Sequence, residues 1–420
     1  MVFAALQRIY TGFVNPPPAQ KRDDAIRFGL LGASNIAPIA LIKPAQAHSE
    51  VIIAAVAARD RSRGEAYAKK HDIPIVHSSY EDLLNDPTID AVYIAVPNSL
   101  HFEWALRAIN ARKHVLLEKP ACSNAEEAKT LFNHPLLAAP SAPVILEAFH
   151  YRFHPAWQTF LSLVHDDNVG PVKHVFAQQY FPKGLLFSND DIRWQYKLSG
   201  GALMDFGTYP LNCLRQVLRE EPVEVLQAQG RVASSKSGKA EDQLVEEAIT
   251  ATYKTESGKT ARLVADLATS SSWVKSLPGF GWPKCEVELE EKDVGSSGGE
   301  IRSVKRKVTI WNHLMPSIYH RIDVEDTHAI RRDGKPVKTW SETQHLKACS
   351  WSSEDRRGVT GEDWWTTYSY QLHEFVNKVK RRDGSGVWVD GEDTIKQMEA
   401  IDRTYEKAGM KKRPTSTFEL

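Results

Sequence analysis

Cysteine is scarce in this sequence, which has only four among its 420 residues. Cys122, Cys213, Cys285 and Cys349 stand far apart, and no C-x-x-C pair occurs. This spacing excludes a zinc finger and a disulfide framework, because both need cysteines that are grouped along the chain. Since free thiols persist in a reducing environment, we expect a cytoplasmic protein.

An excess of either charge is also missing, and so is a long apolar segment. Lysine and arginine number 53, and aspartate and glutamate number 53 as well. Such a balance lacks the basic surface that binds nucleic acids or anionic membranes. No continuous apolar run reaches the ~18 residues of a membrane-spanning helix. We therefore expect neither a nucleic-acid partner nor a membrane partner.

Between residues 25 and 147, short apolar runs alternate with stretches of helical periodicity. The runs 51–57 (VIIAAVA) and 90–96 (DAVYIAV) are apolar almost throughout, as strands covered on both faces must be. Other strands are predicted at 26–31, 114–117 and 144–147, and helices at 36–47, 62–70, 80–84, 100–110 and 124–133. This alternation predicts an α/β fold with a doubly wound parallel sheet, the Rossmann architecture.

After residue 149 strands follow one another with few helices between them. They are predicted at 172–180, 223–233, 244–253, 260–269, 285–290 and 304–311, and helices at 201–219, 364–380 and 392–408. Many of these strands alternate apolar and polar residues, which is typical of an antiparallel sheet with one covered face. We expect a hairpin tip or a flexible insertion at 295–299, and an irregular surface loop or insertion at 335–361.

The change of pattern predicts how the chain is divided, and a chain of this length favours two domains. We expect an N-terminal arm at 1–24, a Rossmann domain at 25–148 and a frayed tail at 411–420. Between them, residues 149–410 are expected to form an α+β domain with a largely antiparallel open sheet.

A glycine turn follows the first predicted strand. Aligned to G-x-G-x-x-G/A, the segment places Gly32, Ser34 and Ala37 at the three small positions. The first allows a tight turn, the second lets backbone N–H groups approach a pyrophosphate, and the third allows close packing of helix on strand. Ser34 replaces a glycine, but its hydroxyl can donate to a phosphate. With Asn35 and Ile36, these residues form the predicted nucleotide turn.

Arg59 and Asp60 end the second predicted strand, where the ribose of a dinucleotide binds. A carboxylate here favours the 2′-hydroxyl of NAD, whereas a guanidinium suits the 2′-phosphate of NADP. Because Arg59 comes first, we predict NADP as the cofactor, and Asp60 keeps NAD open as the alternative.

Two further strand ends carry polar residues. Pro97, Asn98 and His101 follow the strand 90–96, and Glu118 and Lys119 follow the strand 114–117. Because ligands of open α/β sheets bind beyond the carboxyl ends of strands, we expect these side chains near the nicotinamide. The Lys119 ammonium is suited to holding a substrate hydroxyl.

A second constellation lies in SGGALMDFGTY, the segment that ends at Tyr209. Asp205 and Tyr209 stand four residues apart and share one face of a helical turn. Pro210 fits only if the regular helix begins near Gly207 or kinks there. A tyrosine with a pKa near ~10 is a poor base at neutral pH, so we expect Lys119 to lower the pKa of Tyr209 for acid–base work.

These pieces together resemble the Gfo/Idh/MocA oxidoreductases, in the branch with dihydrodiol and NADP-dependent D-xylose dehydrogenases. The matching segments are LGASNIA, AARD, VPNSLH, LLEKP, EAFHYRFHP, IRW, GGALMDFGTY and GEDTIKQMEAIDRTYEKAG. The resemblance implies that Lys119 and Tyr209 are catalytic and that Asp205 orients the substrate. It implies that Arg193 and Trp194 line the same cleft, and that a homodimer forms through the C-terminal sheet.

The activity that the resemblance implies is hydride transfer between a sugar or polyol and NADP, such as oxidation of D-xylose at its anomeric carbon. A trans-dihydrodiol dehydrogenase or a small-carbonyl reductase at the same site is an alternative. A non-catalytic NADP-binding regulator is another, although it would not need Lys119 and Tyr209 together.

Glu147, His150 and His154 are the one grouping that suggests a metal ion. They stand at a strand end before Pro155 and not on a clear helix, so we expect structural roles and no metal.

Overall fold

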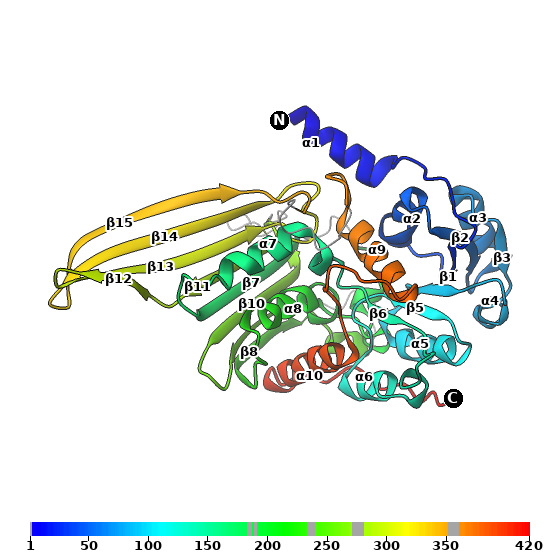
Figure 1. Ribbon diagram of the computed structural model, residues 1–420. Helices are drawn as coiled ribbons and strands as arrows, with labels where there is room; N and C mark the ends of the chain where they lie inside the picture. Colours follow the sequence, from blue (N-terminus) through cyan, green and yellow to red (C-terminus); the bar gives the residue numbers. More distant parts are fainter. Residues whose placement is uncertain (1, 183–186, 189–190, 233–239, 271–280, 352–360) are drawn as a thin grey trace.

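Two β-sheets organise the computed structural model, which describes residues 2–182, 187–188, 191–232, 240–270, 281–351 and 361–420. Figure 1 shows the first sheet with its helices at the right and the second at the left. The first sheet ends at β6 (Ile145–Glu147) and the second begins at β7 (Val172–Pro182). The predicted boundary at residue 148 falls between them, and as a domain boundary it stays a prediction.

The first sheet is parallel throughout. Its strands are β1 (Ile26–Leu31), β2 (Val51–Ala57), β3 (Ile75–His77), β4 (Ala91–Ile94), β5 (His114–Leu117) and β6. Their order is β3-β2-β1-β4-β5-β6, and each neighbouring pair runs parallel. This confirms the predicted doubly wound sheet. The order reverses between β1 and β4, which is where ligands bind in such sheets.

Helices connect these strands. They are α2 (Lys43–Ala47), α3 (Arg61–His71), α4 (Tyr80–Asn85), α5 (His101–Asn110) and α6 (Ala125–Phe132). Two elements differ from the sequence prediction. The helix expected at 36–47 begins with a π-helical turn, Pro38–Ile42. Strand β3 was missed because it has three half-buried residues, too few to show a period.

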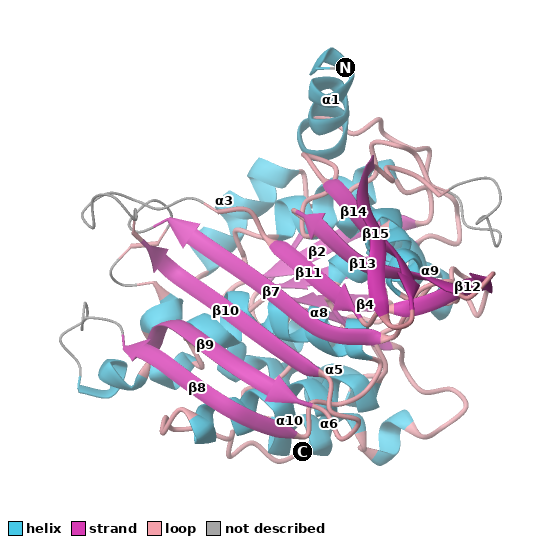
Figure 2. Cartoon of the chain, turned by 90° about the vertical axis from the view of Figure 1, so that its left-hand side faces the viewer, coloured by secondary structure: helices cyan, strands magenta, loops and turns pink. Residues whose placement is uncertain are grey.

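Nine strands of the described chain form the second sheet, whose broad face Figure 2 shows. They are β7, β8 (Glu224–Val232), β9 (Glu246–Lys254), β10 (Thr260–Thr269), β11 (Lys284–Leu289), β12 (Lys292–Ser297), β13 (Glu300–Trp311), β14 (Arg321–Arg332) and β15 (Lys335–Leu346). The order is β15-β14-β13-β11-β7-β10-β9-β8, with β12 beside β13. Apart from the parallel pair β7 and β10, the described neighbours run antiparallel, as predicted.

The prediction of an irregular loop at 335–361 is wrong for residues 335–346, because these residues form β15, which pairs with β14 along its length. Both strands extend away from the rest of the molecule in Figure 1. No residue of β15 is buried, so its sequence lacks an apolar alternation. The turn at Asp333 and Gly334, with φ of 51° and 74°, carries the Asp-Gly signal of a tight hairpin. Residues 352–360 lie outside the described residues.

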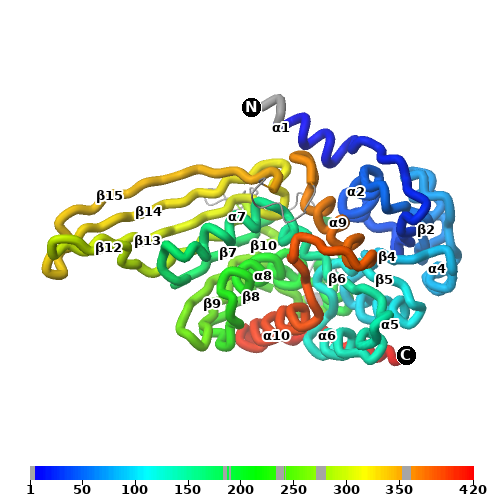
Figure 3. The backbone as a smooth tube through the Cα atoms, in the orientation of Figure 1, coloured from blue at the N-terminus to red at the C-terminus, as the bar shows by residue number. Residues whose placement is uncertain are grey.

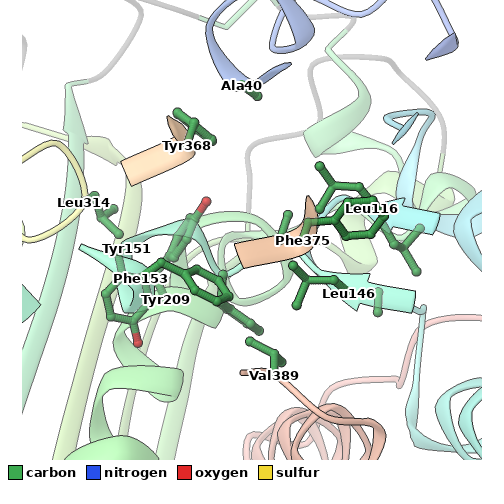
Figure 4. Close-up of a cluster of buried hydrophobic side chains, with 14 of the residues drawn as sticks. Ala40, Leu116, Leu146, Tyr151, Phe153, Tyr209, Leu314, Tyr368, Phe375 and Val389 are labelled. Atoms are coloured by element: carbon green, nitrogen blue, oxygen red, sulfur yellow. The ribbon is translucent and has the colours of Figure 1, made fainter. Parts of the chain in front are cut away.

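In the described part of the chain, four α-helices follow the first sheet: α7 (Pro155–Val164), α8 (Thr208–Leu218), α9 (Thr367–Val379) and α10 (Gly391–Lys407). Helix α8 packs on β7 and β10, whereas α9 returns to α2 and α10 returns to α6. One apolar core therefore extends through both halves. Figure 4 shows Leu116 and Leu146 of the first sheet in one cluster with Tyr209, Tyr368 and Phe375.

The N-terminal arm begins as a helix. After α1 (Val2–Ile9) the chain continues in a π-helical turn, Tyr10–Val14, and then runs extended through its prolines. The Gln46 side-chain amide donates to the carbonyl of Pro16 at 2.9 Å. Figure 3 traces the arm in blue toward α2, so this part of the arm packs on its own chain.

The prediction of a frayed tail at 411–420 is also wrong. The guanidinium of Arg413 is fully buried and pairs with the buried Glu246 carboxylate at 2.5 Å. Further along, the backbone N–H of Ser416 donates to Glu127 at 2.7 Å. The tail is ordered because its polar groups find buried partners, which a polar sequence does not reveal.

We expect Arg413→Met to lower the free energy of unfolding by about 3–5 kcal/mol, because it leaves the Glu246 carboxylate buried without its cation. Urea denaturation measures this loss as a lower midpoint at an unchanged slope. The exposed Lys411→Met is the matched control. Adding Glu246→Gln to Arg413→Met should restore part of the lost free energy of unfolding. Equal urea midpoints for Lys411→Met and Arg413→Met would contradict a stabilising role of the Arg413–Glu246 ion pair.

Candidate active site

The nucleotide turn is built as the sequence predicts. Gly32 has φ of +101°, and a Cβ atom there would lie 3.4 Å from the carbonyl oxygen of Ala95, so glycine suits the position. Ser34 Oγ accepts from the N–H of Ala37 at 3.3 Å, which leaves its hydroxyl hydrogen available. Gly32, Ser34, Asn35 and Ile36 line a cleft, whereas Ala37 is fully buried and packs below it.

Arg59 and Asp60, which follow β2 after Ala58, both line the cleft but have different partners. Asp60 caps α3, because its carboxylate accepts from Ser62 Oγ at 2.7 Å and from the N–H of Arg63 at 3.2 Å. The guanidinium of Arg59 forms no ion pair with the described residues. The arginine is therefore available to an anion, while the carboxylate that would favour NAD is engaged.

The loop after β4 links the two halves of the molecule. Pro97, Asn98 and His101 all line the cleft. The Asn98 amide donates to the carbonyl of Ser199 at 3.1 Å. His101 is buried, with its ring nitrogens 2.8 Å and 2.9 Å from the carbonyls of Pro120 and Val96. Burial lowers its pKa to about 4. His101 therefore braces two loops at the cleft, and its expected place near the nicotinamide stays a prediction.

Lys119 reaches across the cleft from the end of β5. Its ammonium donates to the carboxylate of Asp205 at 2.9 Å and to the backbone carbonyl of the same residue at 3.0 Å. It also lies 4.9 Å from the centre of the Tyr209 ring. The neighbouring Glu118 accepts from the hydroxyl of Tyr93 at 2.6 Å. Burial raises the pKa of Glu118, although Lys119 opposes the change.

Asp205 lies on a π-helical turn, Leu203–Gly207, directly before α8. The regular helix begins at Thr208, which accommodates Pro210 in its first turn as the sequence requires. Arg193 donates to the second oxygen of Asp205. Burial acts to raise the pKa of Asp205, but Lys119 and Arg193 outweigh it and hold the pKa at about 2.

Tyr209 contradicts one expectation. Burial raises the pKa of this phenol well above its usual value, with further contributions from Tyr368 and Glu118, where we expected Lys119 to lower it. The ammonium of Lys119 lies over the ring, 4.9 Å from its centre. The hydroxyl instead lies 3.1 Å from Nε2 of His150.

His150 is a cleft residue whose role sequence reasoning missed. We expected a structural role for it, but it lines the cleft beside Tyr209. Its Nδ1 lies 2.8 Å from Thr367 Oγ1, and its ring stacks on Tyr368 with the centroids 4.1 Å apart. These partners are distant in the sequence, so no local pattern indicates them. The only available signal was the histidine in EAFHYRFHP.

Trp194 does not line the cleft as expected. It is buried in a small apolar cluster with Ala202 and Leu267, whereas Arg193 does line the cleft. Glu147, which the sequence groups with His150 and His154, has its own partners. Its carboxylate accepts from the backbone N–H of Ala121 and from the hydroxyl of Thr394. Within the described ranges no cluster of His, Cys, Asp or Glu is arranged to hold a metal ion.

The cleft has a volume of about 1210 Å³ and runs from the nucleotide turn to the second sheet. Trp282 lines the cleft, and its ring lies 5.7 Å from that of Tyr319. The buried Gln179 also lines the cleft, and its side-chain oxygen has no hydrogen-bond partner among the described residues. The volume suits a dinucleotide with a small substrate. No helix in the described part of the chain has the length and apolar character needed to cross a bilayer.

Family profiles match both halves of the chain. The profile described as "Oxidoreductase family, NAD-binding Rossmann fold" matches residues 26–135, and that of the "GFO/IDH/MocA C-terminal domain" matches residues 157–291. Together they cover more than half of the sequence. The chain belongs to the Gfo/Idh/MocA oxidoreductase family.

Curated relatives match part of the chain. The D-xylose 1-dehydrogenase (NADP(+)) 2 of Haloferax volcanii is 39% identical over 193 residues, which are 46% of this chain and 57% of that protein. The trans-1,2-dihydrobenzene-1,2-diol dehydrogenase of Danio rerio is 36% identical over 210 residues, 49% of this chain and 60% of that one. The matches therefore span less than two thirds of these relatives.

Solved structures resemble nearly the whole chain. KijD10, a 3-ketoreductase from Actinomadura kijaniata in complex with NADP and TDP-benzene, matches with a TM-score of 0.64 at 22% identity, over 91% of this chain and 98% of that one. The aldose-aldose oxidoreductase from Caulobacter crescentus complexed with glycerol gives 0.65 at 20% identity, over 92% and 98%. At such identities the likeness shows the fold alone.

Proposed function

We propose that this chain is an NADP-dependent oxidoreductase that acts on a hydroxyl-bearing carbon of a sugar or polyol. The observation that carries the proposal is the gathering of Lys119, Asp205 and Tyr209 in one cleft, beyond the carboxyl end of β5. An ammonium and a phenol can bind and polarise a CH–OH group. One relative is named for D-xylose and NADP(+), and another for a dihydrodiol, which supports this class of reaction.

The residues of the cleft fit NADP. The Gly32 turn leaves the space that a pyrophosphate needs at a helix start, and the Ser34 hydroxyl hydrogen is available there. Arg59 offers an unpaired guanidinium where a 2′-phosphate would bind, and Asp60 is engaged in capping α3. These contacts favour NADP over NAD.

The protein's own groups would orient the substrate. An ammonium has three hydrogens, and Lys119 uses two on Asp205, so one remains for a substrate hydroxyl. Tyr209 lines the same cleft. Asp205 anchors Lys119 and keeps lone pairs for a neighbouring hydroxyl. NADP, when bound, supplies the hydride acceptor for oxidation and the donor for reduction.

We propose an aldopyranose such as D-xylose, oxidised at the anomeric carbon, as the substrate. The unpartnered oxygen of Gln179 can accept from a sugar hydroxyl, which supports a hydroxyl-rich ligand. The Trp282 ring, which packs against Tyr319, offers an apolar wall for the C–H face of a sugar. A homodimer through the second sheet is part of the proposal, and β15 leaves the edge of that sheet exposed.

Arg59→Ala should weaken the binding of NADPH by about tenfold to a hundredfold, because a charge-assisted contact of ~1.5–3 kcal/mol is lost. The binding of NADH should change little. Fluorescence titration of each nucleotide measures both constants, and Arg61→Ala, on a side chain outside the cleft lining, is the control. An equal loss for both nucleotides would sink the assignment of the 2′-phosphate.

Lys119→Met should reduce turnover by about 10²–10⁴-fold while the affinity for NADPH stays within about twofold, because the lysine polarises the substrate and not the nucleotide. Turnover is followed at the NADPH absorbance band over a panel of aldoses, polyols and trans-dihydrodiols. Activity with aldoses supports the sugar assignment, whereas activity with dihydrodiols alone replaces it. A wild-type protein that binds NADPH but turns over no member of the panel would instead be a nucleotide-binding regulator.

A further inference from the structure

The proton of the reacting hydroxyl needs an acceptor, and Tyr209 alone is poorly suited to that role. Its phenol is buried, and burial raises its pKa. Lys119, which would stabilise a phenolate, lies over the ring and gives its hydrogen bonds to Asp205. The polar atom that does reach the Tyr209 hydroxyl is Nε2 of His150, at 3.1 Å.

The contacts around His150 favour a proton on Nδ1. Thr367 Oγ1 lies 2.8 Å from Nδ1 of His150 and 3.4 Å from the carbonyl oxygen of Leu314, which can only accept. When the Thr367 hydroxyl turns toward Leu314, its oxygen accepts from Nδ1. Nε2 then has a free lone pair, to which the Tyr209 hydroxyl can donate at 3.1 Å.

The surroundings of His150 keep it neutral before the reaction. Burial lowers its pKa to about 3, and the positive charge of Lys119 and the buried His313 act in the same direction. From α9 it faces Tyr368, whose ring stacks on it, and from its own segment His154. A neutral imidazole has a free lone pair on Nε2 at any pH above about 4, and as a weak base it holds a proton only while the hydride leaves.

We propose that His150 is a positioning residue that orients Tyr209 and takes its proton, so that the two form a relay for alcohol oxidation. This inference rests on the oxidoreductase activity proposed above. The substrate O–H donates to Tyr209 Oη, because the hydrogen of Tyr209 already points to His150. As the C–H hydrogen leaves with its electron pair to the oxidised nicotinamide, the substrate proton moves to Tyr209 and the Tyr209 proton moves to Nε2. A carbonyl and an imidazolium result.

The charge of the cleft is conserved in this step. The site loses one positive charge as the oxidised nicotinamide is reduced, and it gains one on His150. Because Lys119 already places a cation beside His150, the imidazolium releases its proton readily to solvent afterwards. The relay thus avoids a free tyrosinate at neutral pH.

The first test compares the pH profile of kcat in the wild type with that of His150→Leu. The variant should lose at least about a hundredfold at pH 7, and its rate should then rise about tenfold per pH unit, because Tyr209 must lose its proton to solvent. The wild-type rate should be nearly flat over the same range. A His150→Leu variant with a flat profile would overturn the relay, even if its turnover is low.

A second pair of variants separates the relay from a structural role. Thr367→Val removes the acceptor of the Nδ1 proton and should lower kcat about tenfold with unchanged KM, and Thr367→Ser should restore it. The matched control is another His–Thr contact, His174 Nδ1 to Thr260 Oγ1 at 2.7 Å, which lies outside the cleft lining. Thr260→Val should leave kcat and its pH profile unchanged. Equal losses of kcat in Thr367→Val and Thr260→Val would contradict the relay.

Nitrogen NMR of histidine-labelled protein without nucleotide provides a readout that needs no turnover. The His150 resonance, assigned by its absence in His150→Leu, should show a protonated Nδ1 and an unprotonated Nε2 that does not titrate between pH 5 and 9. A proton on Nε2 would overturn the proposal. If the wild type turns over none of the panel, the oxidoreductase assignment fails by itself, and this spectrum still decides the His150–Tyr209 geometry.

Discussion

The carboxylate of Asp205 is the group on which the cleft depends. It is buried, and a buried carboxylate stays ionised only beside cations that compensate for lost hydration. Lys119 comes from the end of a strand in the first sheet, and Arg193 from a short helix of the second half. The requirement to neutralise one charge therefore ties both halves of the molecule together at the point where the reaction is proposed. The same ion pair holds the Lys119 ammonium over the ring of Tyr209, 4.9 Å from its centre.

Contacts from distant parts of the chain hold this arrangement in place. Helices α9 and α10 return from the second half to pack on the first, so the cleft lies over one continuous core. Arg413 donates to the carbonyl of Gly200 at 2.6 Å, and its partner Glu246 accepts from the N–H of Leu203 at 2.9 Å. The end of the chain thereby fixes the loop that leads into Asp205. Similarly, Thr367 of α9 sets the orientation of His150 behind Tyr209.

Prediction from sequence was strongest where burial leaves a clear pattern. The strands β2, β5 and β10 match their predicted limits, because a strand covered on both faces or on one face shows apolar runs or alternation. It failed for β15, where no side chain is buried and backbone pairing alone forms the strand. It also failed for the tail, since the burial of Arg413 depends on a carboxylate 167 residues away.

The sequence by itself determined the parallel sheet, the glycine turn with Arg59, and the placement of Lys119 at a strand end. Each of these follows from local patterns of burial, backbone freedom and position after a strand. Only the tertiary structure decided that Asp60 caps a helix, that Asp205 lies between two cations, and that the Tyr209 hydroxyl meets Nε2 of His150. Those outcomes depend on which charges and lone pairs meet across long sequence separations in a low-dielectric interior, and no local pattern records such meetings.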